Sequence, residues 1–258
     1  MCVSGALAIR IPISPGRLEA YRLFHAAART SSDGYAGDRH GGNGGGRVFI
    51  AHGHPNIEAT IDAAVKQAYE SRCQDKGWAD DIPGKECVAL LALYDSTGGD
   101  DWINRTGWLS SASPCEWRGI KCERGHVTSL GLHNNQLTGT IPPELGNLSA
   151  LTKLWLNGNQ LTGTIPPGLS NLGALVSLWL GGNKLTGSIP LELGNLGALK
   201  VLDLHHNQLT GTIPPELGNL GALEVLLLHD NQLTGTIPPP LKRLCNTVPK
   251  CKSGQTIT

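Results

Sequence analysis

The 24 residues from Leu151 to Ala174 read LTKLWLNGNQLTGTIPPGLSNLGA, and close copies of this segment occur five times in succession. The copies share the pattern LxxLxLxxNxLTGxIPxxLxxLxx, and they begin at Val127, Leu151, Leu175, Leu199 and Leu223. A fixed period of this length is typical of solenoids, in which each repeat forms one coil and packs on its neighbours. We therefore predict a stack of five coils over residues 127–246.

Each coil carries seven positions that are apolar in every copy. In the second coil these are Leu151, Leu154, Leu156, Leu161, Ile165, Leu169 and Leu172. One coil is too small to cover these side chains, so they must be buried between stacked coils. Because side chains alternate along a strand, the LxL segment places two leucines inward and the residue between them outward. Stacking then predicts a parallel sheet along one wall of the solenoid.

One asparagine recurs where the chain leaves that wall. Its copies are Asn135, Asn159, Asn183, Asn207 and Asn231. A buried polar side chain needs hydrogen-bond partners. We therefore predict a ladder of amides that bond to the backbone of the turns.

The sheet wall consists of the outward residue between the two strand leucines of each coil and the two residues after the second leucine. Its positions vary between coils, and those chosen as candidates for partner binding are Trp155, Asn157, Trp179, Asp203, His205, His206, Leu227, His229 and Asp230. Trp155 and Trp179 are expected to be neighbours on adjacent strands, with Gly181 and Gly182 leaving an open floor beside Trp179. Tryptophans often anchor interfaces, so this surface predicts a docking site. The alternative is that the tryptophans only shield the sheet.

The histidines and aspartates of the last two coils give the wall a polar, titratable end. Imidazoles titrate near neutral pH, so partner binding is expected to depend on pH between about 5 and 7. A zinc or catalytic site is the alternative, since ligands on adjacent coils can converge. However, the sequence lacks the closed ligand spacing of structural metal sites, and the wall is open to water. We therefore predict no metal ligand, no catalytic residue and no cofactor.

The segment before the coils has a different character. It contains an apolar helix within ECVALLALYDSTGGDDW from Glu86, a Gly107-Trp108 turn, and PCEWRGIKC over residues 114–122. With the coils, these motifs resemble plant-type leucine-rich-repeat proteins, whose N-terminal cap occurs in receptor-kinase ectodomains and polygalacturonase-inhibitor-like proteins. The resemblance covers about Glu86 to Asn246 and implies an α/β repeat solenoid with a concave parallel sheet. It also implies that the LTGxIP segments form a second short sheet.

The cap is expected to cover the first coil, with Trp102, Trp108 and Trp117 buried in it rather than binding a ligand. Four cysteines close to the repeats are disulfide candidates: Cys115, Cys122, Cys245 and Cys251. Cys115 and Cys122 close a short loop that pins the cap to the first strand. A Cys245–Cys251 loop is expected to cover the last coil. The family often has a further cysteine pair in the cap, a role that Cys87 would fill with Cys73.

Disulfides at both ends of a repeat array indicate an oxidising compartment, so we predict an extracellular location. The N-terminal sequence MCVSGALAIRIPISPG lacks the basic segment of a secretory signal as written. Asn104 and Asn147 stand in glycosylation sequons, which are used only if the chain enters the secretory pathway.

The predicted domains are an N-terminal extension without a recognised family over residues 1–85, the cap over 86–126, five repeats over 127–246 and a short C-terminal cap over 247–258. Within the extension, Arg17–Arg29 and Asn56–Arg72 are predicted helices, and the glycine-rich segment Gly41–Gly46 lies between them.

The net charge is zero, and no run of like charges marks a nucleic-acid-binding arm, so DNA, RNA and anionic membranes are not expected partners. The apolar runs are too short to cross a bilayer, and no nucleophile elbow, P-loop, kinase or metalloprotease motif occurs. We predict a non-catalytic recognition module that binds a protein, a peptide or a polysaccharide on its concave sheet. The alternatives are an inhibitor of a secreted hydrolase and an ectodomain-like fragment of a receptor kinase.

Overall fold

The computed structural model describes residues 57–110, 113–242 and 250–252. The chain divides into two compact units, Met1–Ser71 and Arg72–Thr258. In the first unit only the start of α2 (Ile57–Asp75) is described, and this helix confirms the one predicted over Asn56–Arg72. The helix predicted over Arg17–Arg29 and the Gly41–Gly46 segment lie outside the described residues.

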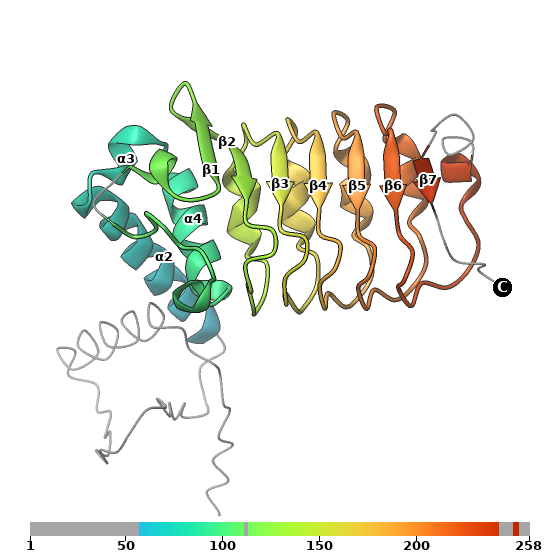
Figure 1. Cartoon of the computed structure of the whole chain (residues 1–258), viewed down its shortest axis with the longest axis horizontal. Helices are drawn as coiled ribbons and strands as arrows, with labels where there is room; N and C mark the ends of the chain where they lie inside the picture. Colours follow the sequence, from blue (N-terminus) through green and yellow to red (C-terminus); the bar gives the residue numbers. More distant parts are fainter. Residues whose placement is uncertain (1–56, 111–112, 243–249, 253–258) are drawn as a thin grey trace, which may run out of the picture. The chain divides into compact units, whose positions relative to one another are not determined.

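The second unit is built on one sheet whose strands follow one another in chain order (Figure 1). The five coil strands run parallel and are β2 (His126–Gly131), β3 (Lys153–Trp155), β4 (Ser177–Trp179), β5 (Val201–Asp203) and β6 (Val225–Leu227). β1 (Ile120–Glu123) joins β2 in an antiparallel pair, and β7 (Lys250–Lys252) pairs with β6 in parallel. Equivalent leucines of successive coils face each other, as Leu154 and Leu178 do. The predicted coil stack and parallel wall are therefore confirmed.

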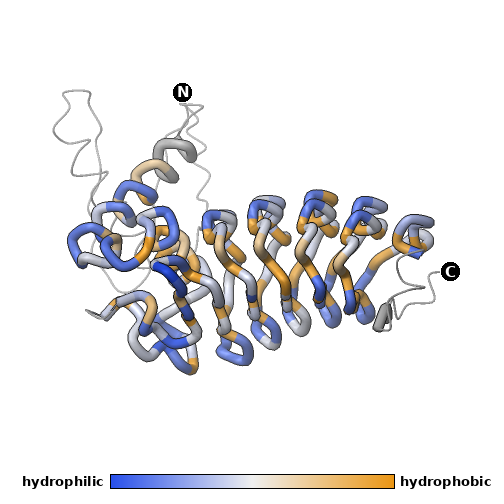
Figure 2. The backbone as a smooth tube through the Cα atoms, turned by 90° about the horizontal axis from the view of Figure 1, so that it is seen from above, coloured by the Kyte–Doolittle hydropathy of each residue, from blue (hydrophilic) through white to orange (hydrophobic). Residues whose placement is uncertain are grey.

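Behind the sheet, each of the first four coils returns through a short 3-10 helix (Figure 1). These helices are η3 (Pro143–Asn147), η4 (Pro167–Asn171), η5 (Leu191–Asn195) and η6 (Pro215–Asn219). The proline of the Ile-Pro step precedes each helix in an extended conformation, which its ring favours. All seven apolar positions of the second coil are at most 1% exposed. Figure 2 shows that hydrophobic stretches alternate with hydrophilic turns along the coils.

The asparagine ladder is present as predicted. Asn159 accepts bonds from the backbone N–H groups of Asn135 (2.9 Å) and Leu137 (3.1 Å) in the preceding coil. Its amide N–H₂ donates to the carbonyl oxygens of Leu132 and Leu156, each at 2.9 Å. Asn183, Asn207 and Asn231 repeat the bond from the leucine N–H and both carbonyl bonds. The backbone N–H groups of Asn183 and Asn207 donate instead to the carbonyl oxygens of His206 and Asp230, each at 3.1 Å. Each asparagine therefore satisfies buried backbone groups in two coils at once.

The second sheet implied by the LTGxIP segments is reduced to local pairing. Thr162 donates its backbone N–H to Gly139 O at 2.7 Å, and three later coils repeat this bond at 2.8 Å. Isolated parallel bridges join Thr140 to Thr162 and Thr212 to Thr234. Among the described residues, these contacts do not extend into named strands.

The N-terminal cap is a helical layer with an aromatic core. It contains α3 (Trp78–Asp81), α4 (Gly84–Ser96), η1 (Gly99–Asp101) and η2 (Pro114–Glu116). Three tryptophans predicted to pack in the cap are indeed buried there, with ring centroids 4.8 Å apart for Trp102 and Trp108 and 4.9 Å apart for Trp108 and Trp117. α4 packs against η3, so the cap covers the open end of the first coil.

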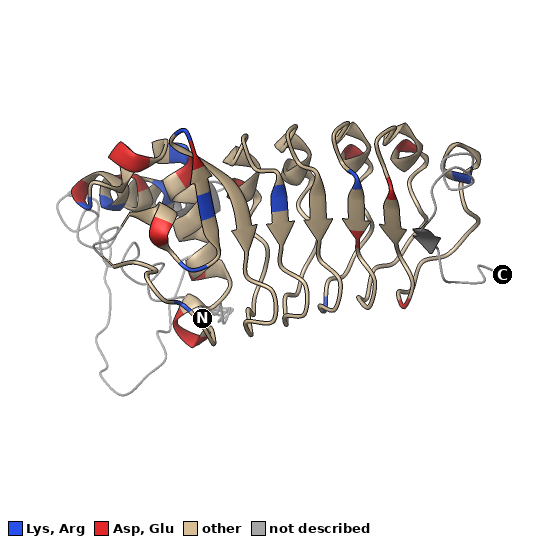
Figure 3. Ribbon diagram, turned by 45° about the horizontal axis from the view of Figure 1, so that its top comes forward, with Lys and Arg blue, Asp and Glu red and all other residues tan. Residues whose placement is uncertain are grey.

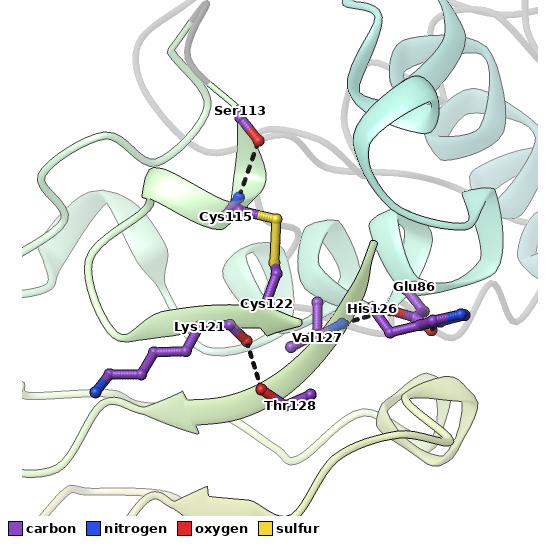
Figure 4. Close-up of a disulfide and its surroundings, with 8 residues drawn as sticks. All are labelled: Glu86, Ser113, Cys115, Lys121, Cys122, His126, Val127 and Thr128. Atoms are coloured by element: carbon purple, nitrogen blue, oxygen red, sulfur yellow. Dashed lines mark hydrogen bonds and ion pairs between the residues drawn. A yellow bond between two sulfur atoms is a disulfide. The ribbon is translucent and has the colours of Figure 1, made fainter. Parts of the chain in front are cut away.

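A buried carboxylate joins this cap to the first coil (Figure 4). Glu86, which is fully buried in α4, accepts the backbone N–H of Val127 at 2.8 Å and lies 2.8 Å from the His126 ring. Close by, the predicted Cys115–Cys122 disulfide ties η2 to β1. The side chains of Cys245 and Cys251 lie outside the described part of the chain.

The cap reaches further towards the N-terminus than residue 86. Cys87 pairs with Cys73, as the resemblance implied, and Trp78 meets Trp117 edge to face at 4.9 Å. The division of the chain remains a prediction. These contacts lead us to propose that the cap begins at about Cys73.

Candidate functional site on the sheet wall

The parallel register aligns the outward strand residues in a row. Gly131 pairs with Trp155, Trp155 with Trp179, Trp179 with Asp203, and Asp203 with Leu227. The prediction that the two tryptophans are neighbours is therefore confirmed. The row is apolar at β3 and β4, polar at Asp203 on β5 and apolar again at Leu227 on β6. The polar end of the wall is formed by Asp203 and by the residues that follow β5 and β6, namely His205, His206, His229 and Asp230.

The apolar end presents partly covered aromatic surface. Trp155 and Trp179 are both half-buried. Lys153 Nζ lies 5.7 Å from the centre of the Trp155 ring, which is within the range of a cation–π contact. His133 approaches the same indole with ring centroids 6.3 Å apart. Asn157, also half-buried, accepts the backbone N–H of Asn134 through its carbonyl oxygen.

The expected open floor beside Trp179 is wrong at Gly181. A Cβ atom on this buried glycine would collide with His205 Nδ1 and would lie 2.6 Å from Asp203 Oδ1. The glycine occupies the coil position that holds His205 and His229 in the next two coils. Because Gly181 has no side chain, His205 and Asp203 occupy the space beside it. The surface next to Trp179 is therefore not open at this position.

Asp203 also differs from the expectation of an exposed wall residue, because only 1% of it is accessible. Its Oδ1 accepts the backbone N–H of His205 at 3.2 Å and is in short contact with His205 Nδ1. A buried carboxylate requires such partners. Asp203 therefore orients the His205 ring and is not itself accessible to a partner.

Three imidazoles meet at the polar end. The His205 ring centre lies 4.9 Å from those of His206 and His229, and the His206 and His229 centres are 5.6 Å apart. Asp230 Oδ2 lies 3.1 Å from His206 Nδ1 and 3.8 Å from His229 Nε2. The sequence placed these residues on one wall, but it did not show that they converge.

Charge is sparse on the coil strands, whereas the cap carries many charged residues of both signs (Figure 3). The two glycosylation candidates lie outside the wall. Asn104 is half-buried and its Oδ1 accepts the hydroxyl of Thr106 at 2.9 Å, while Asn147 is exposed at the end of η3. Both remain predicted sites.

A repeated coil, a buried amide ladder and a wall that varies from coil to coil define a solenoid in which a constant scaffold presents variable residues. Models of leucine-rich repeats match residues 126–171, as two copies, and residues 174–196, 198–220 and 222–244. The leucine-rich-repeat ectodomain of the receptor kinase SOBIR1 from Arabidopsis thaliana is 32% identical, with a TM-score of 0.57 over 66% of this chain and 92% of that one. The chain belongs to the leucine-rich repeat family, in its plant type.

Other relatives agree with this assignment. The BIR3–SERK2 complex from Arabidopsis thaliana contains a chain that is 39% identical, with a TM-score of 0.53 over 60% of this chain and 86% of that chain. Two curated relatives from the same plant, the receptor-like kinase TMK4 and the probable inactive receptor kinase RLK902, are each 38% identical. Those matches cover 25% and 24% of this chain but only 6% and 9% of the kinases. The chain thus matches less than a tenth of either kinase.

Proposed function

We propose that the chain is a non-catalytic recognition module that binds a protein or peptide partner on the sheet wall. The observation that carries the proposal is the row formed by Trp155 and Trp179, which varies between coils while the scaffold beneath it is constant. The similar BIR3–SERK2 structure is a complex, which supports a protein partner. The ectodomain relatives support a binding role rather than catalysis.

The tryptophan pair has the properties of an interface anchor. Both indoles are half-buried in the free chain, so the sheet holds them in place before a partner arrives. Pre-ordered aromatic side chains lose little conformational entropy on binding and offer a large apolar area. Leu227 continues the row on β6 and is also half-buried. We therefore place the centre of the contact on β3 and β4.

The test compares the wild-type chain with the double variant Trp155→Ala/Trp179→Ala. Leu191→Ala is the matched control, because Leu191 is an exposed large apolar residue in η5, behind the sheet. The three immobilised chains are offered extracellular fluid from the source organism, and a captured protein is then titrated in purified form. Loss of an anchor costs about 2 kcal/mol or more, which corresponds to roughly a 30-fold weaker Kd. Equal affinity of all three chains for every captured protein would refute the proposal.

An extracellular location is part of the same proposal. Two disulfides in the cap and the relation to receptor ectodomains support it. None of the helices among the described residues is long and apolar enough to span a bilayer. Mass spectrometry of the native protein tests the proposal, since Cys115 and Cys122 recovered as free thiols would contradict it.

Polysaccharide binding and inhibition of a secreted hydrolase remain alternatives from the sequence. The same three chains distinguish them, first on a set of cell-wall polysaccharides and then in an assay of polygalacturonase activity. Polysaccharide binding or inhibition that depends on Trp155 and Trp179, without any protein partner, would favour these alternatives over the proposal.

A further inference from the structure

We propose that His205, His206 and His229 form a binding site for a divalent transition metal, with Zn²⁺ as the ion of choice. One nitrogen can be taken from each ring so that all three lie within 4.8 Å of one another. Imidazole nitrogens are common ligands of zinc. The site stands on this geometry and does not depend on the proposed partner binding.

The 24-residue period of the coils brings together histidines that are far apart in the sequence. His205 and His229 are 24 residues apart and occupy equivalent positions in successive coils, so the parallel sheet brings them together. Their rings are nearly parallel, with centres 4.9 Å apart, and His206 completes the triangle from the next position of the chain. Ligands that converge in this way need no short sequence motif. The absence of such a motif is the reason why the sequence predicts that no metal binds here.

Two of the three imidazole rings contact a carboxylate through Nδ1. The Asp203 carboxylate meets His205 Nδ1, and Asp230 Oδ2 lies 3.1 Å from His206 Nδ1. In metal sites a ligating histidine usually donates its second N–H to a carboxylate, which fixes the ring and frees the other nitrogen for the ion. His205 and His206 are arranged in this way, with Nε2 left free for the metal.

The charge balance also favours a cation. Among the described residues, every ion pair of Asp203 and Asp230 is made with a histidine ring. Two carboxylates lie beside the three rings, and that of Asp203 is buried, where an uncompensated negative charge is costly. A divalent ion on the three rings would neutralise it. In addition, His229 Nδ1 is buried without a hydrogen-bond partner, and a bond from its lone pair to the metal would satisfy this atom.

The backbone of each coil fixes where two of these residues sit. His206 (φ 48°) and Asp230 (φ 57°) are left-handed, as are Asn134 (φ 52°), Gly158 and Gly182 at the equivalent position of the first three coils. This conformation is therefore a feature of the coil, and in the last two coils the position carries a histidine and an aspartate.

Binding requires a small closure of the triangle. With Zn–N bonds of about 2.0–2.1 Å, tetrahedral ligands stand roughly 3.3 Å apart. His206 is exposed, and rotation of its side chain can provide this approach. Three protein ligands leave one coordination position, which a water molecule would occupy in the free chain.

The test uses the untagged full chain, stripped with EDTA, freed of EDTA and titrated with ZnCl₂ by calorimetry. Two variants take the residue found at the equivalent position of another coil: His206→Gly, as in Gly182, and His205→Asn, as in Asn157. His133→Asn is the matched control, because His133 has the same coil position as His205 but lies outside the cluster. We expect the wild type and the control to bind one Zn²⁺ more per chain than either cluster variant, or to bind it at least tenfold more tightly.

A second readout separates binding from unfolding. Zn²⁺ should raise the melting temperature of the wild type and the control but not that of His206→Gly, whose circular dichroism should match the wild type. With Co²⁺ as a probe, the wild-type spectrum should show nitrogen and oxygen ligands only. Equal zinc stoichiometry and affinity in all four chains, or a thiolate charge-transfer band, would overturn the site.

Discussion

At the residue scale, Asn159 shows how one side chain holds two coils together. Its amide serves backbone groups of Asn135, Leu137, Leu132 and Leu156, all of which are buried. Leaving a buried polar group unsatisfied costs about 1–3 kcal/mol. The ladder is therefore required because the strands are too short to satisfy the backbone of the turns.

Asn159→Ala should consequently lower the free energy of unfolding by at least about 3 kcal/mol. Asn157→Ala is the control two residues away, on the half-buried wall, and should change it by less than about 0.5 kcal/mol. Urea unfolding followed by circular dichroism measures both. Similar losses in the two variants would show that the ladder bonds do not stabilise the fold.

Gly181 leads to a second prediction at this scale. Gly181→Ala places a methyl group against His205 and Asp203, whereas Gly197→Ala meets nothing within 4 Å. Overpacking of this kind typically costs about 1–3 kcal/mol. Thermal unfolding should therefore separate the two variants, with Gly181→Ala less stable than the wild type and Gly197→Ala close to it. An unchanged melting temperature for Gly181→Ala would mean that His205 moves away freely.

The side-chain contacts around Gly181 could not be predicted from the repeat pattern. The period predicted the strands, the burial of the leucines and the asparagine ladder, because these depend only on which positions repeat. Whether His205 leans towards Gly181 or into solvent depends on side-chain rotation, which the pattern does not determine. The sequence therefore identified the wall residues but placed Asp203 on the surface and missed the convergence of the imidazoles.

At the scale of elements, the cap is held to the first coil by the Glu86 carboxylate in α4 and by the disulfide between η2 and β1. The motif predicted the disulfide, but it did not predict the role of Glu86, because a charged residue at a helix start usually faces solvent. Both contacts act at one end of the stack. In a solenoid, where each coil contacts only its neighbours, damage at one end should stay local.

The disulfide variant Cys115→Ser/Cys122→Ser tests this locality. Closing so short a loop contributes about 2–3 kcal/mol. Amide hydrogen exchange should speed up in β1 and β2, whereas the amides of β5 and β6 should keep their protection. Uniform loss of protection along all coils would instead show that the stack unfolds as a single unit.

At the scale of the whole molecule, each coil is an exchangeable unit of 24 residues. Deletion of Leu151–Ala174 would stack the third coil directly on the first, and Asn183 would take the place of Asn159 in the ladder. Trp155 would be lost, but the contacts that join Gly181, Asp203 and the three histidines to one another would remain. The shortened chain should therefore fold, bind Zn²⁺ as the full chain does, and bind the protein partner at least about tenfold more weakly.

Circular dichroism, calorimetry with ZnCl₂ and partner titration measure these three outcomes on one protein. Deletion of only Leu151–Thr162 is the control, because half a coil breaks the register and should prevent folding. A folded chain without the second coil that loses zinc binding would contradict the assignment of the metal to the fourth and fifth coils. A folded chain that retains full partner affinity would move the docking surface away from Trp155, so the two proposals fail separately.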